Sequence, residues 1–140
     1  MMPAHEPIRE LAVEGLRFSF QRPRPGVLLV RIEGDDRDQF GPAPFDVLDA
    51  ELSRHWPLEL FVDTREAQGA SPRVRESWTE WFSRNRHRLK RVSILASTRY
   101  MNVTIGVAKL FSRTGELIQI YSDPALFEQA LAVASSRSRW

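Results

Sequence analysis

The chain has 140 residues, of which 42% are hydrophobic and 27% charged, as in an ordinary globular domain. A domain of this length buries about two-thirds of the surface of the unfolded chain, so its core needs no cross-link. The absence of cysteine excludes disulfides, thiolate metal sites and cysteine catalysis. No apolar run reaches the roughly 18 residues of a membrane span, and the first residues lack the layout of a signal peptide, so we expect a cytoplasmic protein.

The net charge of +2 is unevenly distributed along the chain. Residues 1–63 hold seven basic and twelve acidic side chains, a net charge of −5, whereas residues 64–140 hold thirteen and six, a net charge of +7. A nucleic-acid-binding protein usually carries a basic stripe on a clearly positive domain. We therefore expect no nucleic-acid partner, and we interpret the opposite signs as attraction between the halves or as faces with different surroundings.

Two short strands are predicted near the amino terminus. Residues 16–20 alternate apolar and polar side chains, and residues 21–26, with two prolines and a glycine, interrupt the pattern. Residues 27–33 resume it, so we expect an antiparallel hairpin near one edge of a sheet. The preceding residues 1–11 are interpreted as an extension. Residues 35–38, three aspartates and one arginine, are interpreted as a solvated link, because a calcium loop needs more oxygen ligands at alternating positions.

A helix and a central strand follow. Phe45, Leu48 and Leu52 recur at helical spacing, which predicts an amphipathic helix. Residues 58–63 are mostly apolar, which predicts a buried strand that ends at Asp63.

The region after this strand is where we expect function. Residues 64–70 are interpreted as a polar loop, and Ser71-Pro72 has the composition of a helix start, with a favoured N-cap followed by proline. In open α/β sheets, ligands, anions and regulatory groups bind at the carboxyl end of a strand and the positive end of the next helix.

The helix that begins at Pro72 has the clearest amphipathic pattern in the chain. The side chains of its stripe are Val74, Trp78, Trp81, Phe82, Asn85 and Leu89. Trp81 lies at the margin of the stripe beside Arg84 and Arg88, and Trp and Arg are enriched at binding hot spots. We interpret these three residues as a partner-binding surface. The alternative is that Trp81 closes the core and the arginine stems cover it.

The rest of the chain continues the alternation. We predict a strand at residues 91–97, a helix at 99–113, a strand at 117–121 and a helix from Pro124. Because strands alternate with helices after the hairpin, we predict an α/β domain with a mixed, mainly parallel sheet of about five strands and four helices. The pattern leaves open whether the helices cover one face of the sheet or both.

This arrangement resembles the STAS family, the anti-sigma-factor antagonist domain, and particularly its SpoIIAA-like branch. The residues that carry the resemblance are Leu60-Phe61-Val62-Asp63, Lys90-Arg91-Val92-Ser93-Ile94-Leu95, and Gly115 to Tyr121 followed by Ser122-Asp123-Pro124. The resemblance covers residues 12–134 and leaves residues 135–140 as a flexible tail. It implies a single STAS-like domain with an N-terminal β-hairpin and helices packed largely on one face.

The resemblance also implies a bacterial, non-catalytic regulatory domain that docks to a protein partner. In anti-sigma-factor antagonists, a serine within Asp-Ser-Ser-Gly or a similar sequence at the start of the second helix is phosphorylated by a partner kinase. Here Ala70-Ser71-Pro72-Arg73 stands at that place, so Ser71 matches while the preceding Asp and the following Ser-Gly are absent. Ser71 is a candidate phosphorylation site, with helix capping as the other interpretation, and the nearby Arg65 and Arg73 extend the predicted partner-binding surface.

The sequence contains no recognisable catalytic motif. Asp63, Ser71 and His87 have the residue types of a triad, but His87 lies sixteen residues after Ser71, roughly 24 Å along a helix, which is too far for proton transfer. We therefore expect no enzyme activity, no metal and no cofactor.

The alternative function is the binding of a small hydrophobic, lipid-like molecule. The apolar helix faces near Trp78, Val103 and Val107 could part to admit it, although the same residues could form a closed core. The sequence is compatible with an oligomer in either case.

Overall fold

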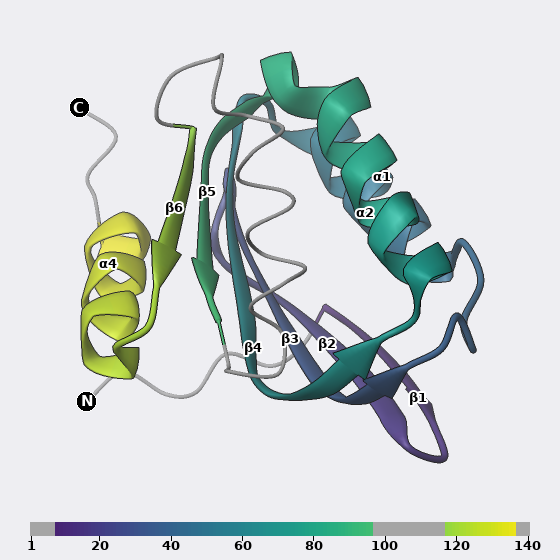
Figure 1. Cartoon of the computed structure of the whole chain (residues 1–140). Helices are drawn as coiled ribbons and strands as arrows, with labels where there is room; N and C mark the ends of the chain where they lie inside the picture. Colours follow the sequence, from purple (N-terminus) through teal and green to yellow (C-terminus); the bar gives the residue numbers. More distant parts are fainter. Residues whose placement is uncertain (1–7, 97–116, 137–140) are drawn as a thin grey trace.

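The computed structural model of the protein describes residues 8–96 and 117–136. These residues form one sheet of six strands flanked by three α-helices and a short 3₁₀ helix (Figure 1). The strands are β1 (Arg9–Val13), β2 (Leu16–Arg24), β3 (Val27–Asp36), β4 (Leu58–Ala70), β5 (Leu89–Leu95) and β6 (Ile118–Tyr121). The helices are α1 (Ala43–Arg54), α2 (Pro72–Asn85), the 3₁₀ helix η1 (Arg86–Arg88) and α4 (Pro124–Ser136).

The strands lie in the sheet in the order in which they occur in the chain. β1, β2 and β3 pair antiparallel, which confirms the predicted hairpin, and β3 to β6 pair parallel. β4 is therefore a central strand, parallel to both of its neighbours, as the apolar run at residues 58–63 indicates. This confirms the mixed, mainly parallel sheet.

The sheet has one strand more than the sequence predicts, because β1 lies partly within the predicted extension at residues 1–11. Its residues pair with β2 from Arg9 opposite Phe20 to Val13 opposite Leu16. β1 is largely exposed, with Leu11 packed against the core. An edge strand of this kind lacks a strong apolar signal, and its place is fixed by backbone pairing with β2.

β4 is longer than predicted. The sequence indicates an end at Asp63 and a loop over residues 64–70, whereas the strand continues to Ala70. Pairing with β5 does stop at Asp63, opposite Leu95, but pairing with β3 continues to Asp36 opposite Ala70, with register shifts on the way. The polar residues are thus held by hydrogen bonds to one neighbouring strand, a long-range contact that local composition does not show.

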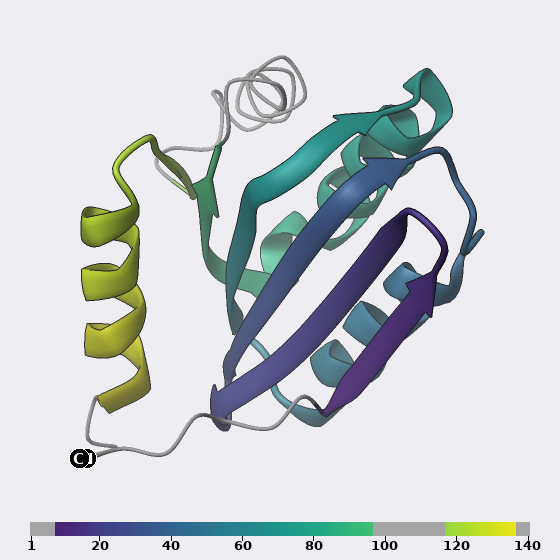
Figure 2. The same cartoon turned by 90° about the horizontal axis from the view of Figure 1, so that it is seen from below.

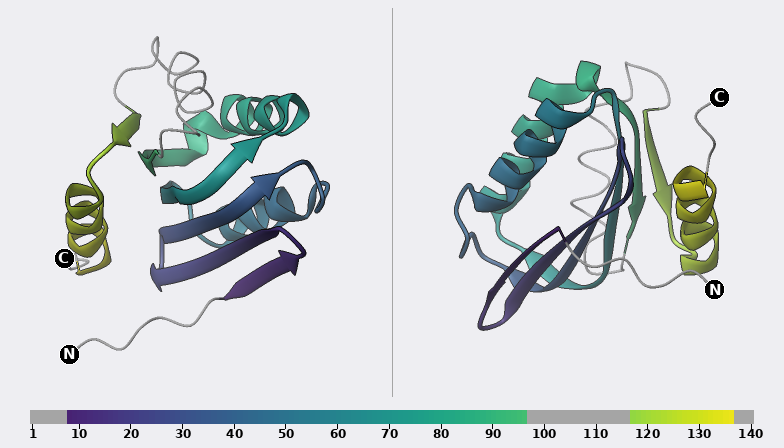
Figure 3. Two further views of the ribbon diagram at one scale, coloured as in Figure 1. Left: turned by 60° about the horizontal axis from the view of Figure 1, so that its bottom comes forward. Right: turned by 180° about the vertical axis from the view of Figure 1, so that it is seen from behind.

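The helices cover both faces of the sheet. Helices α1 and α2 pack on one face and α4 packs on the opposite face (Figures 1 and 3). Leu60 and Val62 of β4 belong to the core under α1 and α2, whereas Phe61 belongs to the core under α4. The prediction of helices largely on one face holds for α1 and α2, and α4 is the exception, because the central strands are apolar on both sides.

Two sequence predictions concern residues beyond this description. The helix predicted at residues 99–113 and the closing Gly115 lie outside the described residues. Among the helices of residues 8–96 and 117–136, none has the length and apolar character needed to cross a membrane.

Candidate functional site

Ser71 lies at the start of α2, directly after the carboxyl end of β4. Its Oγ accepts a hydrogen bond from the backbone N–H of Val74 at 3.3 Å, and its own N–H donates to the carbonyl of Asp36 at 2.9 Å. These contacts confirm the capping role predicted for Ser71. The residue is half-buried, so the hydroxyl sits at the surface and next to the positive end of a helix of 14 residues.

Three aspartates, Asp35, Asp36 and Asp38, lie at and just after the end of β3, and Asp36 contacts the backbone of Ser71. Burial raises the pKa of the Asp36 carboxyl above its ordinary value, and the neighbouring carboxylates of Asp38 and Asp35 act in the same direction. The backbone N–H of Asp38 donates to Asp36 Oδ1 at 3.1 Å, which acts in the opposite direction. Any negative charge added at Ser71 would therefore meet both a favourable helix end and unfavourable carboxylates.

Arg73 reaches across this junction. Its Nε lies 3.0 Å from Asp38 Oδ2, and 81% of its side chain is exposed. An ion pair this exposed contributes at most about 1 kcal/mol and exchanges partners readily. Arg73 is thus a surface cation within the same short stretch of chain as Ser71, as the sequence predicts.

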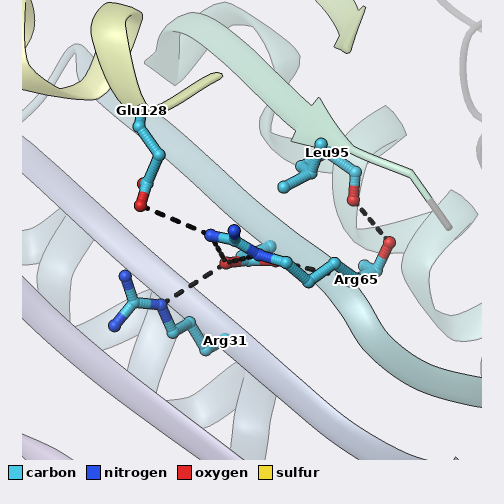
Figure 4. A network of polar contacts seen from close by, with 6 residues as sticks. Arg31, Arg65, Leu95 and Glu128 are labelled. Atoms are coloured by element: carbon cyan, nitrogen blue, oxygen red, sulfur yellow. Dashed lines mark hydrogen bonds and ion pairs between the residues drawn. The ribbon is translucent and has the colours of Figure 1, made fainter. Parts of the chain in front are cut away.

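Arg65 serves a different contact from the one that the sequence suggests. Its guanidinium lies 2.8 Å from Asp63 Oδ2 and 3.4 Å from Glu128 Oε2, so that it bridges β4 and α4 (Figure 4). Hydrogen bonds to Asp63 raise the pKa of Arg65. Arg31 of β3 approaches the same buried Asp63 carboxylate at 3.4 Å. Beside this group, Thr64 Oγ1 donates to the carbonyl of Leu95 at 2.6 Å.

This network was not found by sequence reasoning. Arg31, Asp63, Arg65 and Glu128 come from three elements, and none of them stands in a motif with the others. The network connects α4 to the sheet through the pair between Arg65 and Glu128. Arg65 therefore has partners within the domain, and its contribution to a partner-binding surface stays a prediction.

Trp81 is not a surface residue, and its assignment to the partner-binding surface is wrong. Its exposed fraction is 0%, and its Nε1–H donates to Asp49 Oδ1 of α1 at 2.8 Å. The ring packs against Phe45 and Phe82. The carboxylate of Asp49 on α1 accepts a hydrogen bond from the indole N–H, which explains why Trp81 is buried although it lies at the margin of the apolar stripe. The alternative reading, in which Trp81 closes the core, is confirmed.

The arginines of the predicted surface remain accessible. Arg84 is exposed near the end of α2, and Arg88 is half-buried in η1. Arg73 and Arg84 are eleven residues apart, about three turns, so they lie on the same exposed side of the helix at about 16 Å from each other. Ser77 and Glu80 lie between them on this side.

Asp63, Ser71 and His87, the triad rejected from the sequence, do not come together in the structure. Asp63 is occupied by Arg31 and Arg65, while His87 belongs to η1, beyond the opposite end of α2 from Ser71. Within residues 8–96 and 117–136, no three His, Asp or Glu side chains gather in a way that could hold a metal ion.

Of the three residues considered for a hydrophobic site, Trp78 lies within the described part of the chain. Trp78 is buried, and its ring lies 4.9 Å from that of Phe45 and 5.7 Å from that of Phe82, measured between centroids. Val103 and Val107 lie outside the described residues.

The sheet, with its antiparallel hairpin, parallel central strands and helices α1 and α2 on one face, has a SpoIIAA-like fold, as the comparison with solved structures shows. One similar solved structure is an uncharacterized protein of the DUF3478 family with a SpoIIAA-like fold from Shewanella loihica PV-4, with a TM-score of 0.61 and 16% identity. Another is an anti-sigma factor antagonist from Mycobacterium paratuberculosis, with a TM-score of 0.58 and 15% identity. In both cases the match covers 86% of this chain and 97% of the other.

No protein-family model and no curated protein sequence matches this chain. At 15–16% identity the similarity of the solved structures concerns the fold. The resemblance predicted from the sequence is confirmed at this level.

Proposed function

We propose that the protein is a non-catalytic regulatory domain that binds a protein partner through the exposed side of α2, defined by Arg73, Ser77, Glu80 and Arg84. The observation that carries this proposal is the position of Ser71, a half-exposed hydroxyl at the junction of β4 and α2, in a fold similar to that of an anti-sigma factor antagonist. The domain would act in the cytoplasm and without a cofactor.

The chemistry of this side of α2 supports a protein partner. It presents two guanidinium groups and one carboxylate, with a serine between them, and it has no large apolar side chain. Mixed charges of this kind favour a partner with a complementary pattern of charges, because like charges brought together at an interface are costly. Arginine also provides several donors in a fixed plane for carboxylates on the partner.

Phosphorylation of Ser71 is the second part of the proposal. A phosphate would add a charge of about −1.5 to −2 at the positive end of α2. Among residues 8–96 and 117–136, the guanidinium of Arg73 is held only by the exposed contact with Asp38, so a phosphate could take its place. Asp38 would then be released from Arg73 and repelled by the phosphate. Modification would thereby change both the charge and the shape of the surface that meets the partner.

Site-specific photo-crosslinking tests the partner surface. A photoreactive amino acid is placed at Glu80 on α2 or, as a matched control, at the exposed Arg17 on β2. In cells that produce the protein, we expect a discrete cross-linked species from position 80 and none from position 17. Equal labelling from both positions, or none from position 80, would contradict the proposal.

Binding measurements with the purified partner test the two parts separately. The double variant Arg73→Glu and Arg84→Glu is expected to weaken binding at least tenfold, while Arg17→Glu leaves it unchanged. Ser71→Asp should alter the affinity and Ser71→Ala should not. If both Ser71 variants bind as wild type does, the phosphorylation switch is removed and the interaction surface stands.

A further inference from the structure

A groove lies between α4 and the adjoining face of the sheet. Helix α4 lies on the side of the sheet opposite to α2 (Figures 2 and 3). Its volume is about 340 Å³. Phe61 of β4, Tyr121 of β6 and Ala130 of α4 give it apolar walls. Pockets that hold small molecules begin at about 300 Å³, so the groove is of a size to hold a short molecule.

Ser93 of β5 lines this groove and is the residue that indicates a ligand. The residue is 1% exposed, and its Oγ has no hydrogen-bond partner among residues 8–96 and 117–136. Its neighbours Val92 and Ile94 point to the core under α1 and α2, so strand alternation directs Ser93 to the α4 side. Leaving a buried hydroxyl without a partner costs about 1–3 kcal/mol.

The groove combines this hydroxyl with a balanced set of charges. Glu59 of β4 and Arg91 of β5 lie opposite each other in the sheet register, and both line the groove. Gln129 of α4 and the hydroxyl of Tyr121 are the other polar groups of the residues that line it. Since one carboxylate is matched by one guanidinium, the lining carries no net charge. Such a site favours a neutral ligand over an acid or an amine.

The mouth of the groove is apolar. Leu126 and Val133 of α4 line it, and they are 53% and 54% exposed. They stand two turns apart on the same side of the helix, with Ala130 between them. An apolar molecule that entered here would cover side chains that now face water, which is a favourable contribution to binding.

We propose that the groove between α4 and strands β4 to β6 binds a small neutral molecule with an apolar body and a single oxygen function, such as a short-chain ketone, ester or alcohol. The oxygen accepts a hydrogen bond from Ser93, and the apolar body lies against Phe61, Tyr121 and Ala130. This site is independent of the proposed partner surface, because the sheet separates the two.

Titration of the full-length, ¹⁵N-labelled protein with 2-octanone tests the proposal. We expect saturable shifts of backbone amide signals that are concentrated at Ser93, Tyr121 and Ala130. Octanoate and octylamine, which have the same chain length with a negative or a positive charge, should bind more weakly. The Ser93→Ala variant should bind 2-octanone about three- to tenfold more weakly, as expected for the loss of one hydrogen bond.

Three variants keep the test interpretable. Ser93→Ala should fold as wild type does, because the hydroxyl that it removes has no partner among the described residues. Ser83→Ala, on the exposed side of α2, should leave binding unchanged. Val133→Trp should fill the groove from its mouth and abolish binding.

Several outcomes would overturn this inference. They are the absence of saturable binding of 2-octanone, equal affinity of wild type and Ser93→Ala, and tighter binding of either charged probe. A dimer in solution that Val133→Glu dissociates would show that a second copy occupies the groove, and it would also overturn the proposal. None of these results affects the cross-linking test of α2, so failure of one proposal is distinguishable from failure of the other.

Discussion

Replacement of Ser71 by alanine measures how much of this side chain serves the helix itself. The perturbation removes one hydrogen bond, from the N–H of Val74 to Ser71 Oγ. Loss of an N-cap serine typically costs about 1 kcal/mol. Here the bond is 3.3 Å long and the residue is half-buried, so water can replace part of it. We therefore expect a loss of about 0.5–1 kcal/mol.

The companion variant Ser71→Asp keeps an acceptor at the same place. A carboxylate gains about 0.3–1 kcal/mol from the helix dipole. The nearby carboxylates of Asp36 and Asp38 oppose this gain. The two effects are of similar size, so the free energy of unfolding of Ser71→Asp should lie within about 0.5 kcal/mol of the wild-type value.

Urea unfolding followed by far-ultraviolet circular dichroism provides the measurement. In thermal unfolding, the same loss in Ser71→Ala would lower the melting temperature of a domain of this length by about 2–4 °C. Ser83→Ala, exposed on the same helix, is the control and should change stability by less than about 0.5 kcal/mol. A loss above about 2 kcal/mol in Ser71→Ala, or no loss at all, would refute the assignment of this serine as a simple surface cap.

Three further predictions concern buried polar groups. The raised pKa of Asp36 means that the folded protein holds this proton more tightly than the unfolded chain, so its contribution to stability falls as pH rises above about 4. Asp36→Asn should be more stable than wild type at pH 7, with a difference that shrinks toward pH 4 in urea unfolding; a constant difference would contradict this. Trp81→Phe, which loses the bond to Asp49, should cost about 2 kcal/mol in the same assay, whereas a surface tryptophan would cost less than about 0.5 kcal/mol. Asp63→Ala should lower the free energy of unfolding by about 2 kcal/mol, measured by thermal unfolding. This is less than the cost of breaking a fully buried ion pair, because Arg65 is partly exposed. An unchanged melting temperature would show that the pair contributes nothing to stability.

Local patterns were sufficient for the elements that are defined by their own residues. The alternation at residues 16–20, the apolar run at 58–63 and the cap at Ser71-Pro72 each indicate a structure that the chain adopts. Hydrophobic periodicity and capping depend on residues a few positions apart, so they can be read directly from the sequence.

The features that the sequence did not reveal depend on residues far apart in the chain. Trp81 is buried because Asp49, 32 positions earlier, offers an acceptor. The last residues of β4 are a strand because β3 pairs with them, and Arg65 is bound because Glu128 reaches it from α4. Ser93 gave no signal either, since a serine within a strand becomes notable only when its surroundings leave its hydroxyl without a partner.

The sequential order of the six strands has a consequence for how the protein is made. Each strand pairs with the strand that precedes it in the chain. The strands can therefore be added to the sheet in the order of synthesis, as the polypeptide leaves the ribosome. Helix α4 departs from this order, because its Phe127 and Ala134 return to Val27, Leu29 and Phe61. A nascent chain without α4 would expose these apolar side chains to water. Exposed apolar patches promote aggregation, so the packing of α4 protects the assembled sheet from it.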